Sequence, residues 1–160
     1  MAISVGDKIP DVKLMAATAD GPKPVQSSEA LGSGKVVLFA VPGAFTPTCS
    51  EKHLPGFVVR SEDIKAKGVD TIACISVNDA FVMGAWGAQQ DPDGQIEFLA
   101  DGNGAFTAGI GLELDGSGFG LGTRSQRYAA IIEDGVVTEL LVESAPGLDV
   151  SSAESILGKL

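Results

Sequence analysis

Cysteine and histidine are scarce in this sequence. Its 160 residues include two cysteines, Cys49 and Cys74, and a single histidine, His53. A chain this long and this poor in cysteine is not a disulfide scaffold, and the two cysteines do not form a C-x-x-C motif. A Cys/His zinc site with the usual number of ligands would have to recruit carboxylates. We therefore expect no metal centre.

Basic residues are also few. The chain has 11 Lys and Arg against 21 Asp and Glu, and its formal net charge is −10. A nucleic-acid-binding surface needs clustered Lys and Arg, so the composition argues against a nucleic-acid partner. No apolar run reaches the ~18 residues that would span a bilayer, and the N-terminus lacks the basic and apolar pattern of a signal peptide. The sequence thus predicts a cytoplasmic protein without a membrane partner.

Apolar residues, by contrast, are plentiful. They make up 44% of the chain and are spread along its length, which excludes a disordered protein. A chain of this size forms one domain with a core of its own. Since neither an internal repeat nor a shift in composition divides it, we predict a single domain over residues 1–160.

The middle of the chain alternates between two kinds of segment. Three continuous apolar segments predict buried β-strands: 35–41, 70–77 and 96–100. Two segments between them have helical features: 48–67 and 80–90. Pro55 and Gly56 predict a kink in the first helix, and Asn78 or Asp79 would cap the second. This alternation predicts a parallel sheet with right-handed crossovers.

The two ends of the chain have shorter elements. Before the first buried strand we expect a strand, a turn and one helical turn, at 11–16, 21–24 and 27–31. After the third we expect a short helix, a glycine-rich loop, a hairpin and a last helix, at 103–110, 115–120, 127–142 and 151–160. Ser151 and Glu154 have the spacing of a capping box for the last helix. Together the elements predict an α/β protein of thioredoxin-like fold, with a central mixed β-sheet flanked by helices.

The most informative segment is V-P-G-A-F-T-P-T-C-S-E, at residues 41–51. A helix begins here, either at Thr48, which forms a capping-box pattern with Glu51, or at Thr46, which precedes Pro47. Either start places Cys49 in the first helical turn, where free N–H groups and the helix dipole favour the nucleophilic thiolate. The segment also follows the carboxyl end of a strand, where open α/β sheets bind ligands.

The alternative is that Cys49 is simply a small buried hydrophobe, as many free cysteines are. Two prolines, two threonines and one glycine occupy the seven residues before it. A core position needs no such arrangement. The composition of the segment therefore favours a nucleophile that is held in place and exposed.

The run P-G-A-F-T-P-T-C at residues 42–49 resembles the active-site motif of the peroxiredoxins, and in particular of the type II branch with the animal peroxiredoxin-five and the plant type II enzymes. Further matching segments are 53–57, 76–82, 86, 99–101, 122–128 and 150–154. The resemblance covers nearly the whole chain and is strongest for plant and bacterial members. It implies a thioredoxin-like fold and an antioxidant thiol peroxidase that needs no cofactor.

The resemblance also implies roles for individual residues. Cys49 would be the peroxidatic cysteine, whose thiolate attacks a peroxide oxygen and becomes a sulfenic acid. Thr46 would hydrogen-bond the peroxide, Pro42 would shield the sulfenic acid, and Arg127 would stabilise charge that develops on the peroxide oxygens. The substrate pocket would be formed by Gly43, Ala44, Phe45 and, as a supporting cation, Arg124.

Each of these roles has a simpler alternative. Thr46 is also explained as a helix cap, and Pro42 as a residue that stiffens the loop. Arg124 competes with Arg127 for the role of active-site cation, but the position in the motif favours Arg127. His53 lies on the same helix face as the peroxidatic cysteine; it either borders the pocket or is a packed histidine, and we assign it no catalytic role.

The sequence departs from some type II members in one respect, because residues 143–151 contain no resolving cysteine. Cys74 lies in the middle of a predicted strand, three residues or ~10 Å below the loop that carries Cys49. A disulfide requires Cα atoms within roughly 7 Å. We therefore expect Cys74 to be a buried structural residue.

These observations predict a one-cysteine cycle. Hydrogen peroxide and alkyl hydroperoxides would be the substrates, and glutathione with glutaredoxin, or thioredoxin, would be the external reductant. The resemblance also implies a homodimer. The alternative from another functional class is a peroxide sensor, or redox-dependent binding partner, in which oxidation of Cys49 changes a surface. A disulfide oxidoreductase is disfavoured by the missing C-x-x-C motif.

Overall fold

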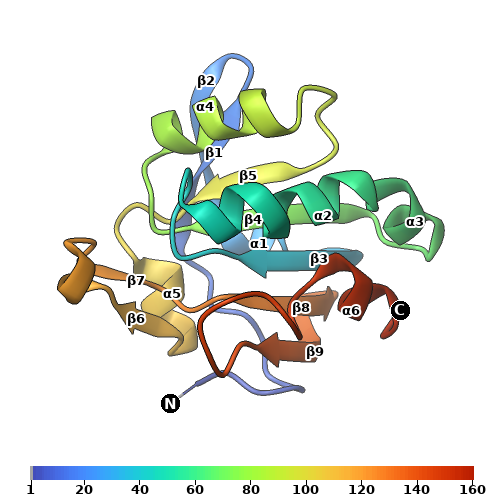
Figure 1. Cartoon of the computed structure of the whole chain (residues 1–160). Coiled ribbons are helices and arrows are strands. Elements are labelled where there is room, and N and C mark those ends of the chain that lie inside the picture. The colour runs from blue at the N-terminus through green and yellow to red at the C-terminus, as the bar shows by residue number, and fades with distance from the viewer. Residues whose placement is uncertain (1) are drawn as a thin grey trace.

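The computed structural model describes residues 2–160 and is built around a seven-stranded mixed sheet (Figure 1). The strand order is β2-β1-β5-β4-β3-β8-β9. The bounds of these strands are β1 Lys13–Thr18, β2 Gly21–Gln26, β3 Lys35–Ala40, β4 Thr71–Ser76, β5 Glu97–Ala100, β8 Tyr128–Glu133 and β9 Val136–Val142. A separate two-stranded ladder joins β6 Glu113–Asp115 to β7 Thr123–Ser125. The predicted thioredoxin-like α/β fold with a mixed central sheet is confirmed.

The pairing of the strands follows the sequence pattern. β3 pairs with β4, and β4 with β5, in parallel, whereas β8 runs antiparallel to both β3 and β9. The β8–β9 hairpin turns at Asp134 and Gly135, whose φ angles are 50° and 83°. Two successive positive φ angles match the right-handed twist of the flanking strands, which is why an Asp-Gly pair turns a hairpin well.

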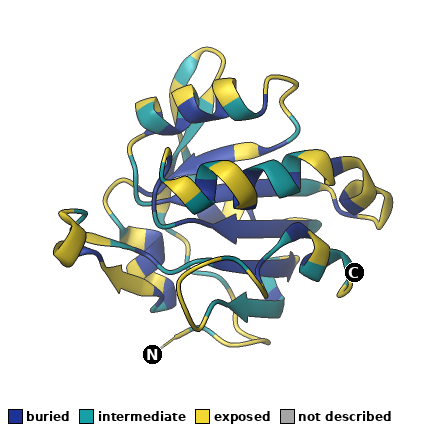
Figure 2. Ribbon diagram, viewed as in Figure 1, coloured by how far each residue is buried: buried dark blue, intermediate teal, exposed yellow. Residues whose placement is uncertain are grey.

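Helices cover both faces of the sheet. One face is covered by η1 Cys49–His53, α2 Leu54–Val59, α3 Ser61–Ala66, α4 Ala80–Gln90 and α6 Ala153–Leu157; the other face has α1 Ser27–Ala30 and α5 Ala105–Ile110. Along β3, Val37 and Phe39 belong to the first core cluster, and Val36 and Leu38 to the second. Because side chains alternate across a strand, a strand buried on both faces must be apolar throughout. Figure 2 shows this buried sheet between exposed helix surfaces.

One prediction about the ends of the chain was wrong, and two short strands beside the predicted glycine-rich loop were missed. The segment predicted as a turn at 21–24 is part of β2, which pairs with β1 at the edge of the sheet. Pro22 and Pro24 are compatible with this strand because only one side of an edge strand needs backbone donors. The glycine-rich segment around 115–120 forms the tip of the β6–β7 ladder and includes a short helical turn, Ser117–Phe119. Its strands of three residues are too short for alternation to reveal.

The helix predicted over 48–67 is present, but it is interrupted at Arg60 and not at Pro55 and Gly56, where the kink was predicted. Residues 47–59 are continuously helical, and the break occurs at Arg60, with φ −95° and ψ 7°. Pro55 lies inside this continuous helix, just after the π-helical turn Cys49–His53, and has no N–H to donate to a preceding carbonyl. Immediately before it, the N–H of Leu54 donates to the carbonyl of Cys49, which widens this turn to the π-helical register.

Helix caps decide the remaining boundaries. Asp79 caps α4, since its Oδ1 accepts from the N–H of Val82 at 2.8 Å, as one of the two predicted alternatives requires. The predicted Ser151 and Glu154 box does not form. Instead Ser152 caps α6 by accepting from the N–H of Ser155 at 3.1 Å. Within residues 2–160 no helix has the length and apolar character needed to cross a bilayer.

Candidate active site

The helix that carries Cys49 begins at Pro47, so the second of the two predicted starts is correct. Thr48 already has helical backbone angles and makes no side-chain cap. The hydroxyl of Thr46 donates to the carbonyl of Gly43 at 2.6 Å rather than capping the helix. Cys49 is therefore the third helical residue and lies in the first turn, as predicted.

Burial of Cys49 differs from the expectation. Its side chain is fully buried and belongs to the core cluster on the η1 face of the sheet, although the sequence argument favoured an exposed sulfur. Yet the sulfur is not an inert hydrophobe, because Nη2 of Arg127 donates to its Sγ at 3.0 Å. A fixed guanidinium in hydrogen-bond contact stabilises a thiolate more than a thiol. In this fold the nucleophile is thus buried and paired with a cation.

The sheet explains how Arg127 reaches Cys49 from 78 positions away. β8 begins at Tyr128, which pairs with Ala40 at the end of β3. Because β8 runs antiparallel to β3, the residue before Tyr128 lies beside the loop that follows β3 and leads into the Cys49 helix. The position of Arg127 at the start of a strand, predicted from the motif, is confirmed.

Arg127 has a second partner, His53. Its Nη1 donates to Nδ1 of His53 at 2.9 Å. Since a guanidinium only donates, Nδ1 must be unprotonated, and Nε2 carries the proton that it donates to the carbonyl of Ser151 at 2.9 Å. Burial, and then the positive charge of Arg127, lowers the pKa of His53 to about 3. His53 is therefore a neutral, fully buried hydrogen-bond acceptor. The sequence suggested either a packed histidine or a residue bordering the pocket, and neither interpretation included its hydrogen bond with Arg127.

Arg124 does not contact the sulfur. Its Nη1 donates to the carbonyl of Pro42 at 3.3 Å and its Nε to the carbonyl of Leu121 at 3.0 Å, so it ties the loop after β3 to the β6–β7 ladder. A Cβ added at Gly43 would lie 3.0 Å from Nη1 of Arg124 and 3.1 Å from Cγ2 of Thr46. A side chain at this position would require the guanidinium of Arg124 or the methyl group of Thr46 to shift, so glycine lets both approach the backbone closely.

Two further residues that hold the site were missed. Oδ1 of Asn78 accepts from the N–H of Ala44 at 3.0 Å and thereby links the loops that follow β3 and β4. Nε1 of Trp86 donates to Oγ of Ser50, beside Cys49, at 2.9 Å. A signal for Asn78 was available in the sequence. β3 and β4 were predicted as neighbouring parallel strands, and the loops at their carboxyl ends meet at one edge of the sheet. Nothing in the sequence signals the contact of Trp86.

Phe45 differs from the rest of the loop. Its φ is 64° and its side chain is 52% exposed, with the ring 6.4 Å from that of Trp86. A positive φ is costly for a bulky residue and persists only where the surroundings hold it. The loop thus presents an aromatic ring at the surface beside the buried sulfur.

Cys74 lies in β4, where it pairs with Phe39 and is fully buried. Both cysteines are free. Burial is the main cause that raises the pKa of the Cys74 thiol well above its ordinary value. The prediction of a structural cysteine in a strand interior agrees with this environment, since a protonated, enclosed thiol is a poor nucleophile.

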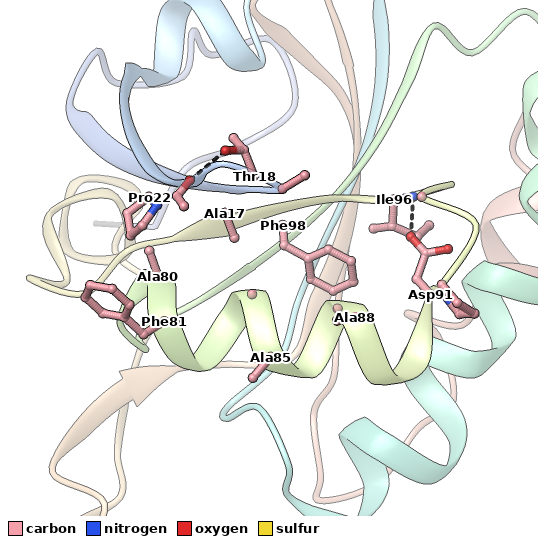
Figure 3. A pocket seen from close by; sticks show the side chains of 16 residues that line it. Ala17, Thr18, Pro22, Ala80, Phe81, Ala85, Ala88, Asp91, Ile96 and Phe98 are labelled. Carbon is pink, nitrogen blue, oxygen red and sulfur yellow. Dashed lines mark hydrogen bonds between the residues drawn. The ribbon is translucent and has the colours of Figure 1, made fainter.

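A groove elsewhere on the molecule lies between α4 and the β1–β2 hairpin (Figure 3). It is lined mainly by small and apolar residues, and it includes neither Cys49 nor Arg127. Its carboxylate, Asp91, is already occupied, since Oδ1 and Oδ2 accept from the N–H groups of Gln95 and Ile96. No group of three or more potential metal ligands occurs in residues 2–160.

Comparison with known proteins agrees with this site. Residues 4–157 match the family described as Redoxin. Peroxiredoxin-2B of Arabidopsis thaliana is 48% identical over 159 residues, which are 99% of this chain and 98% of that protein. Reduced Prx3 of Vibrio vulnificus, in complex with hydrogen peroxide, is 54% identical with a TM-score of 0.93, over 98% of both chains. Peroxiredoxin 5 of Alvinella pompejana is 37% identical with a TM-score of 0.86, over 97% of this chain and 96% of that one.

A buried cysteine at the start of a helix, with an arginine on its sulfur, defines a thiol-dependent peroxidase when it occurs in this fold and with these relatives. The chain belongs to the type II peroxiredoxins, and Cys49 is its peroxidatic cysteine. The resemblance seen in the sequence is thereby confirmed.

Proposed function

We propose that this peroxidase reduces hydrogen peroxide and small organic hydroperoxides in a cycle that uses one cysteine of the chain. The Cys49 thiolate attacks one peroxide oxygen, the O–O bond breaks, and water or an alcohol leaves after taking up a proton. An external thiol then attacks the sulfenic acid, releasing water and forming a mixed disulfide. A second thiol reduces this disulfide and restores the thiolate. Glutathione with glutaredoxin, or thioredoxin, supplies the electrons.

The observation that carries the proposal is the position of Cys74. Its thiol is enclosed in β4, and burial keeps it protonated. A resolving cysteine must reach the oxidised sulfur as a thiolate. Cys74 meets neither condition in the folded protein, which supports resolution of the sulfenic acid by a thiol from outside the chain.

The loop after β3 supplies the remaining contacts for the peroxide. The single hydroxyl proton of Thr46 is donated to the carbonyl of Gly43, which leaves its oxygen as an acceptor. A hydroperoxide offers an O–H donor to such an oxygen, while Arg127 offers N–H donors to the oxygen on which charge develops. Pro42, whose carbonyl is held by Arg124, shields the sulfenic acid, and Gly43, Ala44 and Phe45 border the substrate.

This role of Thr46 has a direct test. Replacement by valine keeps the branched shape but removes the acceptor, and we expect the reaction of Cys49 with hydrogen peroxide to slow about tenfold, the value of one good hydrogen bond. Thr46→Ser keeps the hydroxyl and should retain most of the rate. Stopped-flow oxidation of the reduced protein measures both. Equal losses in the two variants would mean that shape, not the hydroxyl, is what the site requires.

The one-cysteine cycle predicts that Cys74→Ser retains nearly full steady-state turnover. Peroxide consumption would be measured with glutathione and glutaredoxin, and separately with thioredoxin and its reductase, with Cys49→Ser as the background. Turnover retained with either system identifies the reductant. A large loss in a stably folded Cys74→Ser protein would show instead that Cys74 resolves the sulfenic acid. Consumption of one equivalent by wild type with every reductant would favour a peroxide sensor.

We also propose a homodimer, as the resemblance implies. The rings of Phe45, Phe81 and Phe119 are 52%, 76% and 88% exposed, and large exposed apolar side chains are common at interfaces between subunits. Sedimentation equilibrium of the reduced protein gives the stoichiometry directly.

A further inference from the structure

The buried hydrogen bonds around Arg127 extend beyond the sulfur. Nη2 of Arg127 contacts Cys49 at 3.0 Å, and Nη1 contacts Nδ1 of His53 at 2.9 Å. Both partners come from the same turn, because η1 begins at Cys49 and ends at His53. One guanidinium thus joins the two ends of that turn.

His53 is itself fixed from three sides. Its ring centroid lies 5.1 Å from that of Phe39 and 5.6 Å from that of Phe57, and its Nε2 donates to the carbonyl of Ser151. Ser151 in turn is held by Glu143, whose Oε2 accepts from both its N–H and its hydroxyl, at 2.9 and 2.6 Å. The direction of the Nδ1 lone pair is therefore set by packing and by a clamped backbone carbonyl.

We infer that His53 is a positioning residue for the peroxidase reaction, which holds the guanidinium of Arg127 in the orientation that directs Nη2 at the Cys49 sulfur. A guanidinium is planar, and its N–H groups point in fixed directions. Anchoring Nη1 on a rigid acceptor therefore fixes the direction of Nη2 as well. A long arginine side chain without this anchor would sample several rotamers, and only some of them would place an N–H group on the sulfur.

The neutral state of His53 is essential to this role. A protonated imidazole has no acceptor and would repel the guanidinium. The groups that face the ring are Arg127, whose charge opposes protonation, and Glu143, whose charge favours it. Burial and Arg127 prevail, and the pKa of His53 is lowered to about 3, so the acceptor is present throughout the working range of pH.

The inference deepens the proposed function, since it rests on Arg127 acting on the Cys49 sulfur. It is tested by single-turnover oxidation of reduced protein with hydrogen peroxide, which needs no reductant. The single tryptophan, Trp86, donates to Ser50 beside Cys49 and serves as the fluorescent reporter. Failure of the one-cysteine cycle would change steady-state turnover but leave this rate alone, so the two failures are distinguishable.

We expect His53→Leu to slow this oxidation by about 10- to 100-fold, as small misplacements of catalytic groups do. His53→Gln should recover most of the rate, because its amide carries both an acceptor for Arg127 and a donor for Ser151. A purely structural role for the ring predicts no such difference.

Two controls separate positioning from general damage. Thr107→Val removes another buried hydrogen bond, from the Thr107 hydroxyl to Asp101 at 2.8 Å, in α5 away from η1, and it should leave the oxidation rate unchanged. In an Arg127→Met background, His53→Leu should have little further effect, because the group that it positions is gone. An equal loss in both backgrounds, or a wild-type rate in a folded His53→Leu protein, would overturn the inference.

Discussion

Replacing Arg127 with methionine slows the oxidation of Cys49 by hydrogen peroxide by about 10²- to 10³-fold, the usual cost of removing one preorganised donor from a site where charge develops. Nη2 of Arg127 is the charged donor observed on the Sγ of Cys49. Since the sulfur is fully buried, water cannot replace the lost donor. Both the thiolate and the charge on the departing oxygen lose their stabilisation.

The measurement is the second-order rate of oxidation of reduced protein, followed by the fluorescence of Trp86. Arg60→Met is the matched control, because Arg60 is a half-exposed cation 3.9 Å from Asp63 on the surface. Its loss should leave the rate unchanged. A rate for Arg127→Met within a few-fold of wild type would show that the guanidinium contact contributes little to the chemistry.

Arg127→Lys distinguishes charge from geometry. An ammonium group keeps the positive charge but lacks the planar fork that donates to Cys49 and His53 at once. We expect a rate between those of wild type and Arg127→Met. A wild-type rate in the lysine variant would mean that charge alone suffices, and that anchoring on His53 is unnecessary.

The sequence was most informative where local patterns decide the structure. The apolar runs predicted β3, β4 and β5, and their alternation with helices predicted the parallel crossovers. The motif at residues 42–49 identified Cys49, and its distant counterpart identified Arg127. The strand and helix predictions succeeded because strand periodicity and helix starts are short-range features, whereas the role of Arg127 was implied by the resemblance to the family.

Contacts that depend on tertiary packing were not predictable in this way. The hydrogen bond from Leu54 to the carbonyl of Cys49 sets a π-helical register that no propensity encodes, and it accompanies the burial of the sulfur. Asn78 was considered only as a helix cap, although its side chain holds Ala44 across two loops. The hydroxyl of Ser151 donates to Oε2 of Glu143, eight positions earlier, within the irregular segment that follows β9.

His53 shows the same limit most clearly. Its spacing from Cys49 placed both on one helix face, which is correct, but spacing does not reveal which atom of the ring faces a cation. The direction of its hydrogen bonds depends on Arg127 and Ser151, which lie 74 and 98 positions away. Long-range partners of this kind decide whether a buried histidine only packs in the core or also orients a group that takes part in the reaction.

The buried His53 also makes the protein sensitive to acid. The pKa of this imidazole is about 3 in the folded state against 6.5 for an ordinary histidine, chiefly because of burial and secondly because of Arg127. Between these two pH values the unfolded chain binds a proton that the folded chain does not, so stability rises with pH across this window. Above pH 6.5 the contribution is complete, and it is lost progressively as the pH falls towards 3.

We expect this one residue to remove about 5 kcal/mol from the free energy of unfolding between pH 6.5 and 3, because each unit of pKa shift corresponds to about 1.4 kcal/mol. The measurement is urea unfolding at a series of pH values, for wild type and His53→Gln. Carboxylates such as Glu143, whose pKa is lowered by hydrogen bonds from Ser151 and Asp149 despite partial burial, also weaken the fold in acid, but they do so in both proteins. The difference between the two curves therefore isolates His53. It should be steepest between pH 6.5 and 3 and flat above, and parallel curves would show that this imidazole is not held neutral by the fold.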